Sequence, residues 1–148
     1  MDLNDVDRIA AADSHLAVIA TTRADGSVQA AVVNAGMVAH PVSNKPVVAF
    51  VTYGRAKLSN LRARPPATVV FRSGWQWAAV EGTCEIVGLD DSLPGFEPSR
   101  LAALIRAIFV AAGGTHDDWA EFDRAMADER RAAVLVHPER VYSNAGAT

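Results

Sequence analysis

The sequence predicts a mainly β fold with added helices (α+β): a split or closed antiparallel β-barrel of about six strands with peripheral helices. Over the first 89 residues, short runs rich in small and β-branched side chains alternate with turn signals, as strands do. The apolar period then changes to that of helices, and a last strand-like run follows. Strands and helices do not alternate, so a doubly wound nucleotide-binding fold is not expected. Closure into a barrel removes the exposed edges of such a sheet.

Each element follows from its local pattern. The expected strands are residues 15–22, 27–40, 47–53, 67–73, 75–89 and 132–144. The expected helices are residues 3–12, 55–63, 99–112 and 115–132. Turn, bulge and stop signals separate them at Asp25-Gly26, Pro65-Pro66, Gly74, Gly82 and Gly113-Gly114. The last helix opens on Thr115 and Asp118, which resemble a capping box.

Length and composition indicate one domain, residues 1–148. Half of the 148 residues are hydrophobic, which suffices for a single core without covalent staples. Cys84 is the only cysteine, which excludes an internal disulfide and a zinc or iron–sulfur site built on thiols. The first residues carry acids where a signal peptide has lysine or arginine, and no apolar run approaches the roughly 18 residues that cross a bilayer. We therefore expect a cytoplasmic protein with no membrane partner.

The charge is distributed unevenly along the chain. Residues 26–80 contain six cations and no acid, although the net charge of the chain is −3. The phosphate-loop, G-x-G-x-x-G, G-x-S-x-G and H-E-x-x-H motifs are absent, which argues against Rossmann, P-loop, serine hydrolase and zinc protease functions. Binding of single-stranded nucleic acid by a small basic barrel is disfavoured by the negative net charge and the few aromatic residues. No nucleic-acid partner is predicted.

Metal ligands and paired catalytic carboxylates are not indicated. The histidines fall on different expected elements, at His15, His40, His116 and His137. No pair has the spacing of metal ligands, so we expect surface or cap residues and predict no metal site. Glu81 and Glu85 share one face of an expected strand, but Gly82 lies between them, and a solvated strand face is the preferred interpretation.

The basic pair Arg55 and Lys57 stands where a helix usually carries acids. Because a helix N-terminus is already partially positive, cations in its first turn require a compensating partner. A phosphate is the simplest anion that helix-end amides, a guanidinium and an ammonium would hold together. Gly54 lets the backbone approach such an anion, and Asn60 offers a hydrogen bond from the next turn. Alternatively, both cations are surface charges that balance the acidic remainder of the chain.

The aromatic sequence WQW begins the expected fifth strand. Strand alternation sends Trp75 and Trp77 to one face and Gln76 to the other. Trp77 could stack on a flat cofactor or fill a dimer interface, and its alternative is a place in the core.

The chain resembles the split β-barrel superfamily of pyridoxamine 5'-phosphate oxidase-like flavin proteins. Within that superfamily it is similar to the actinobacterial type of deazaflavin-dependent oxidoreductase, which uses coenzyme F420. The resemblance covers nearly the whole length. It rests on HLAVIATTRADGSVQAAVV, GRAKLSNLRARP, WQWAAVEGTCEIV and the tail from AAGGTHDDWAEFDRAM to RRAAVLVHPERVYS. The order G-R-x-K-x-x-N-L-R-x-x-P after a barrel strand is more specific than a lone basic pair.

The resemblance implies a cofactor groove at the interface of a homodimer. It assigns the cofactor phosphate to Arg55 and Lys57, with Asn60 in support. For the flat ring system it implies Gln29, Val32 and Asn34 on one strand, and Pro46, Val48, Phe50 and Thr52 on the next. It places Trp77 near the cofactor, from the same or the partner subunit.

The expected function is an oxidoreductase that uses coenzyme F420 to pass a hydride to a conjugated small molecule such as an enone, quinone or tetrapyrrole. An FMN-binding oxidoreductase of the same fold is the first alternative, because the same basic pair would hold the FMN phosphate. A non-catalytic carrier of a deazaflavin or haem is the second. No catalytic residue is nominated, and Tyr142, His40 or bulk water could supply the proton. The substrate pocket is expected among residues 90–130.

Overall fold

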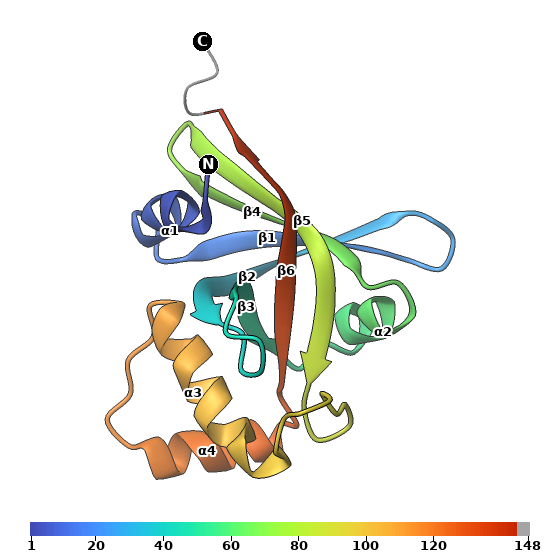
Figure 1. Ribbon diagram of the computed structural model, residues 1–148, viewed down its shortest axis with the longest axis vertical. Coiled ribbons are helices and arrows are strands. Elements are labelled where there is room, and N and C mark those ends of the chain that lie inside the picture. The colour runs from blue at the N-terminus through green and yellow to red at the C-terminus, as the bar shows by residue number, and fades with distance from the viewer. Residues whose placement is uncertain (145–148) are drawn as a thin grey trace.

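Six antiparallel strands close into a barrel in the order β1-β2-β3-β6-β5-β4 (Figure 1), which confirms the predicted fold class. The computed structural model describes residues 1–144. The strands are β1 Leu16–Thr22, β2 Val28–Ala39, β3 Pro46–Thr52, β4 Pro66–Ser73, β5 Gln76–Val87 and β6 Ala132–Ser143. The helices are α1 Leu3–Ala11, α2 Arg55–Ala63, a 3-10 turn Pro98–Arg100, α3 Leu101–Ala111 and α4 Trp119–Asp128. Figure 1 shows α3 and α4 together on one side of the barrel and α2 on another.

The last strand closes the barrel because it pairs on both sides. Strand β6 pairs with β3 through Thr52 opposite Ala132, and with β5 along most of its length. Its register against β5 shifts between Glu81 and Gly82, at the glycine that the sequence marks as a bulge. A Cβ at Gly82 would lie 1.9 Å from the carbonyl oxygen of His137, so only glycine fits this close approach.

Strand β3 separates two cores, and its continuous apolar run follows from burial on both faces. Val48 and Phe50 point into the barrel and are fully buried. The alternate residues Val47 and Ala49 lie in a second core, under Leu104 and Ile108 of α3. Strand alternation therefore fixes which side chains of β3 are accessible beneath the helices.

Close contact between α3 and β2 depends on a glycine. A Cβ at Gly36 would lie 2.4 Å from the carbonyl carbon of Ala111, so a side chain there would push the end of α3 away. The helix therefore lies directly on the strand pair β2 and β3, and its C-terminal end meets the C-terminal part of β2 at Gly36.

The start of the last helix differs from its sequence prediction. Helix α4 begins at Trp119, and Asp118 alone caps it by accepting a hydrogen bond from the backbone N–H of Glu121. Thr115 lies outside the helix, so the expected Thr115–Asp118 capping box is wrong. Among residues 1–144, no helix is long and apolar enough to cross a membrane.

Candidate functional site

A cavity of about 660 Å³ lies between the strand pair β2–β3 and the helices α3 and α4. We call it the main cavity. Its strand wall includes Ser14, Val32, Val33, Asn34, Val51, Thr52 and, from α2, Lys57; its helix wall includes Ile108, Phe109, Ala112, Gly113, Gly114, Phe122, Met126 and Arg131. The strand wall is mostly polar or small and the helix wall mostly apolar. The size is that of pockets for drug-sized ligands, about 300–1,000 Å³.

Lys57 contributes a partly buried ammonium with no carboxylate partner. Its Nζ donates a hydrogen bond to Thr52 Oγ1 at 3.2 Å and lies 5.9 Å from the centroid of the Phe50 ring. Burial lowers the pKa of Lys57, because desolvation disfavours the charged form. Within the described chain, no acid lies within ion-pair distance of it. Cations removed from water are normally paired, so the missing partner points to a ligand.

The hydroxyl of Thr52 is arranged to donate to a ligand. Its Oγ1 accepts hydrogen bonds from the backbone N–H of Gly54 at 3.1 Å and from Lys57 Nζ. With both acceptor positions used, the hydroxyl can only donate, and residues 1–144 offer it no acceptor. Lys57 and Thr52 therefore present donors and no free acceptor to the main cavity.

The N-terminus of α2 adds backbone donors to this donor-rich region. Gly54 is the N-cap, no side chain caps the helix, and no acid occupies its first turn. The first backbone N–H groups of an α-helix have no partner within the helix and carry its positive dipole end. This arrangement suits an anion.

Arg55 lies on the other side of the same helix start. Its exposed side chain lines a neighbouring cavity of about 460 Å³, here called the Tyr53 cavity. Three acids also line this cavity, and each pairs with an arginine other than Arg55: Asp91 with Arg62, Asp90 with Arg130 and Glu129 with Arg131. Residues two positions apart on a helix do not face each other, which separates Arg55 from Lys57. Arg55 and Lys57, which are expected to hold one phosphate together, thus line two different cavities.

The other cations of residues 52–72 are engaged by the protein itself. Arg62 pairs with Asp91 through two hydrogen bonds of 2.9 and 2.6 Å. Arg64 donates to the carbonyl of Thr22, and Arg72 to that of Gly74. Arg55 has no hydrogen bond or ion pair among the described residues. Among residues 52–72, Arg55 and Lys57 are thus the two cations that the fold leaves without an anionic or carbonyl partner.

Asn60 and Gln29 form a hydrogen bond with each other, and neither lines the main cavity. Asn60 Nδ2 donates to Gln29 Oε1 at 2.9 Å and to Thr21 Oγ1 at 3.2 Å, and its Oδ1 accepts from Arg64. Only 9% of the Asn60 surface is exposed, so this amide fastens α2 to the β1–β2 hairpin. Its expected support of a phosphate would be indirect, through the position of the helix.

Three expected contacts on β3 lie away from the main cavity. The side chains of Val48 and Phe50 fill the barrel interior and are 0% exposed, which leaves only their backbone for a ligand. Pro46 begins the strand opposite Ala39, six residues before Thr52. In contrast, Val32, Asn34, Thr52 and Lys57 lie together on the cavity wall.

Trp77 stands on the β4–β5 hairpin, opposite Arg72. Its ring meets Tyr142 edge to face at a centroid distance of 6.1 Å, and it does not line the main cavity of its own subunit. Tyr142 donates to Glu81 at 2.5 Å, and this hydrogen bond raises the pKa of the phenol. Tyr142 is therefore no proton donor to the main cavity within one chain.

The sequence signalled the helix wall only as a stripe of apolar residues. Phe109 and Phe122 face each other with ring centroids 4.8 Å apart, and Met126 lies beside them on the wall. These side chains come from the region where a substrate pocket is expected. Arg131, which follows α4, also lines this wall, and an arginine after a helix end carries no distinctive sequence pattern.

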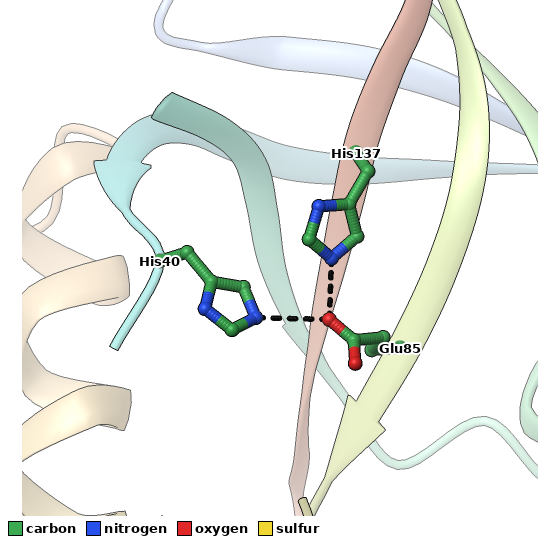
Figure 2. Close-up of side chains that lie close together, drawn as sticks. All are labelled: His40, Glu85 and His137. Atoms are coloured by element: carbon green, nitrogen blue, oxygen red, sulfur yellow. Dashed lines mark hydrogen bonds and ion pairs between the residues drawn. The ribbon is translucent and has the colours of Figure 1, made fainter. Parts of the chain in front are cut away.

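The histidine cluster His40, Glu85 and His137 joins three segments that are distant in sequence (Figure 2). The Nε2 atoms of both histidines contact the same oxygen, Glu85 Oε1, at 2.9 Å for His40. His40 is only 6% exposed. The expectation that His40 and His137 are separate surface or cap residues is therefore wrong, and so is the expectation that Glu85 belongs to a solvated strand face. Strand pairing and the end of β2 bring them together.

The cluster has the donor types of a metal site, yet the hydrogen bonds of His40 oppose that function. The backbone N–H groups of Val42 and Ser43 both donate to His40 Nδ1, at 3.1 Å each. Since Nδ1 accepts, the proton of the neutral ring must be on Nε2, which donates it to Glu85. A metal ion would need the lone pair of that same Nε2 and a donor function at Nδ1.

The carboxylate of Glu85 is the charged centre of the histidine cluster. Burial opposes its ionisation, but hydrogen bonds from His137 and His40 outweigh that effect and hold the pKa of Glu85 below its usual range. The cluster is thus internally satisfied, and His40 has no proton to spare for a distant substrate.

Comparison with known proteins agrees with the fold. Solved structures similar to this chain include an F420 reductase, at 19% identity over 87% of this chain and 90% of that one, with a TM-score of 0.58. A pyridoxamine 5'-phosphate oxidase-related, FMN-binding protein from Nostoc punctiforme matches at 14% identity over 97% and 86%, with a TM-score of 0.64. A heme-binding protein from Mycobacterium smegmatis matches at 16% identity over 97% of this chain and 54% of that one, with a TM-score of 0.63.

At these identities the structures establish the shared fold alone. The family is shown by the sequence itself, because the profile of pyridoxamine 5'-phosphate oxidase matches residues 6–145, nearly the whole chain. The chain belongs to the pyridoxamine 5'-phosphate oxidase family.

Proposed function

We propose that this protein is an oxidoreductase that binds coenzyme F420 in the main cavity and reduces a conjugated small molecule of the enone, quinone or tetrapyrrole type. The observation that carries the proposal is the ammonium of Lys57, which is partly buried, hydrogen-bonded only to a hydroxyl and without any acid partner among residues 1–144. A partly buried cation at an uncapped helix start is suited to a phosphate.

The residues present fit the anionic part of such a cofactor. Lys57, the Thr52 hydroxyl and the first amides of α2 would hold the phosphate, and all of them are donors. Arg55, on the Tyr53 side, would hold further negative charge beyond the phosphate. Coenzyme F420 carries carboxylates beyond its phosphate, whereas FMN ends at the phosphate. The unpartnered Arg55 therefore favours F420 over FMN.

The strand wall fits the flat part of the cofactor. Val32 and Val51 offer small apolar surface, and Asn34 anchors its amide by donating to the carbonyl of Ser14 at 2.9 Å. When bound in its reduced form, the cofactor would supply a hydride. The protein supplies orientation, exclusion of water by the helix wall and cationic anchoring. The second hydrogen of the reduction would arrive as a proton from water, since no aspartate, glutamate, histidine or tyrosine of the described chain lines the main cavity.

An apolar row on the outer face of the barrel supports a homodimer. Val18 pairs directly with Val32 on one side and with Val70 on the other, and paired residues of adjacent strands point to the same face. Val18 is 42% exposed and Val32 67% exposed. Because Val32 also lines the main cavity, a second copy on this face would cover its open side. It would also bring its own Trp77 toward a shared interface.

Titration with F420 and FMN tests the cofactor assignment. Wild-type protein should quench deazaflavin fluorescence at low concentrations of protein, and Lys57→Ala should bind F420 about 10- to 100-fold more weakly, as expected for loss of a charged hydrogen bond. Lys45→Ala is the matched control, since Lys45 is an exposed cation of the same basic region. Equal F420 affinity of wild type and Lys57→Ala would overturn the phosphate assignment.

The alternatives give different results in the same experiment. Tighter binding of FMN than of F420 would indicate the FMN-binding oxidoreductase. Binding of F420 without turnover across a panel of enones, quinones and tetrapyrroles would indicate a carrier. Haem carriage has less support, because no histidine lines the main cavity in the described chain.

A further inference from the structure

The helix wall of the main cavity is built for a flat apolar molecule. The rings of Phe109 and Phe122 pack at 4.8 Å, and Trp119 supports both from behind, with centroids 6.2 and 5.2 Å away. Ile108 and Met126 extend the same surface. Aromatic clusters of this kind are rigid, so the wall would keep its shape when a ligand binds.

Arg131 is the one charged side chain on this helix wall. It lies between α4 and β6, beside Ala132, which pairs with Thr52. Its guanidinium carbon is 4.3 Å from the centroid of the Tyr53 ring, and its Nε donates to Glu129 at 2.5 Å. Stacking and the ion pair hold the guanidinium in place from two directions.

The end of this guanidinium has no partner within the protein. Only Nε is engaged, by Glu129, so both terminal nitrogens keep their N–H groups free of acceptors among residues 1–144. The residues that line the main cavity include two cations, Lys57 and Arg131, and no aspartate or glutamate. Two parallel N–H groups at the end of an arginine match a carboxylate in geometry and charge.

We propose that the acceptor reduced by this protein carries a carboxylate beside its conjugated system, and that Arg131 binds this carboxylate. The inference rests on the proposed function, in which Lys57 and the α2 amides are occupied by the cofactor. The acceptor would lie against Phe109, Phe122 and Met126, with its acidic group toward the α4–β6 junction. Arg131 is then a specificity-determining residue, and neutral analogues of the same shape are bound less well.

A pair of probes of equal shape separates charge recognition from apolar packing. The carboxylate probe is 2-naphthoate and its neutral counterpart is 2-naphthamide, and calorimetry measures their binding to the F420-loaded protein. We expect wild type to bind the acid about 10-fold or more tightly than the amide, as a charged hydrogen bond provides. In Arg131→Gln this preference should be lost, while the affinity for the amide changes by less than about 2-fold.

Arg124→Gln is the matched control, because Arg124 is an exposed arginine of α4 that does not line the main cavity. It should keep the preference of wild type for the acid. Equal affinity of wild type for both probes, or no binding of either, would overturn the proposal. So would an unchanged preference in Arg131→Gln.

The F420 affinity of the same variants distinguishes this inference from the proposed function. If Arg131 serves the acceptor, Arg131→Gln binds F420 as wild type does, whereas Lys57→Ala does not. A loss of F420 binding in Arg131→Gln equal to that in Lys57→Ala would assign Arg131 to the cofactor and overturn its assignment to the acceptor. Failure of F420 to bind wild type would remove the proposed function, and retention of the probe preference in apo protein would still show an anion site at Arg131.

Discussion

Two polar clusters on this barrel differ in how far the protein itself satisfies their hydrogen-bonding groups. The histidine cluster, His40, Glu85 and His137, has acceptors and donors matched to one another, and His40 is anchored on both ring nitrogens. The start of α2 presents Lys57 and Arg55 without any acid partner in the described residues. The residues of the histidine cluster satisfy one another's hydrogen bonds, whereas the cations at the start of α2 remain available to a ligand.

The difference shows why a list of chemically capable residues is a poor guide to function. Two histidines and a glutamate are typical metal ligands. However, the hydrogen bonds that His40 Nδ1 accepts place the ring proton on Nε2, so Nε2 has no lone pair for a metal. A lysine and an arginine are common surface residues, but a partly buried ammonium without a counter-ion is costly unless a ligand supplies one. Unsatisfied groups, rather than capable ones, identify the candidate site.

The largest expected effect on F420 affinity is that of replacing Lys57, in the cluster that the protein leaves without a partner. Lys57→Met should lower F420 affinity about 10- to 100-fold, because it removes a charged hydrogen bond to the cofactor. The free energy of unfolding should stay within about 1 kcal/mol of wild type or rise, since an uncompensated charge is replaced by an apolar chain of similar length. Fluorescence titration and denaturant unfolding measure the two quantities. A lower free energy of unfolding with unchanged F420 affinity would mean that Lys57 has a structural role and does not bind the cofactor.

The opposite result is expected at Glu85. Glu85→Ala should lower the free energy of unfolding by about 1–3 kcal/mol, because the Nε2–H of partly or fully buried histidines then lacks an acceptor. F420 affinity should not change, since no member of the histidine cluster lines the main cavity. Glu85→Gln, which keeps an acceptor oxygen, should lose less stability. Denaturant unfolding of the three proteins at neutral pH tests this, and a loss of F420 binding equal to that of Lys57→Met would break the comparison.

Lowering the pH should reduce the contribution of the histidine cluster to the free energy of unfolding. The pKa of Glu85 is lowered in the folded protein from its ordinary value of 4.5, with burial opposed and outweighed by hydrogen bonds from His137 and His40. A carboxyl group with a lowered folded pKa contributes stability that is complete above its unfolded pKa and is lost as the pH falls through the folded pKa. The gap in unfolding free energy between wild type and Glu85→Gln should therefore narrow below pH 4.5. A gap that is constant down to pH 3 would contradict this.

The fold could be predicted from the sequence because its signals are local. Strand alternation, the Asp25-Gly26 turn and the apolar period of α3 each act over a few residues, and the barrel follows from burying them together. The exception is the start of α4, where Thr115 and Asp118 both resemble caps. In the structure Asp118 accepts the capping hydrogen bond from the backbone N–H of Glu121, and Trp119, the first helical residue, packs against Phe109 and Phe122.

Only part of the candidate site follows from the sequence, since the rest depends on distances that a single sequence does not contain. Lys57 and Thr52 follow from the violated charge preference at a helix start and from the family resemblance. The side chains of Val48 and Phe50 follow the same strand yet point into the barrel, because alternation reverses with each residue and the sequence of β3 is apolar on both faces. His40 and His137 are 97 residues apart in sequence and meet only through β-sheet pairing.

The smallest expected effect concerns Arg62, a cation of the same helix that is satisfied within the protein. It forms two hydrogen bonds with Asp91, and 44% of its side chain is exposed. Exposed ion pairs contribute at most about 1 kcal/mol, so Arg62→Ala should lower the free energy of unfolding by less than that and leave F420 affinity within about 2-fold of wild type. If binding depended on the summed positive charge of the basic stretch, Arg62→Ala would weaken F420 as Lys57→Met does. A large difference between these two variants, measured by the same titration, would show that the missing partner of Lys57, and not its charge alone, defines the cofactor site.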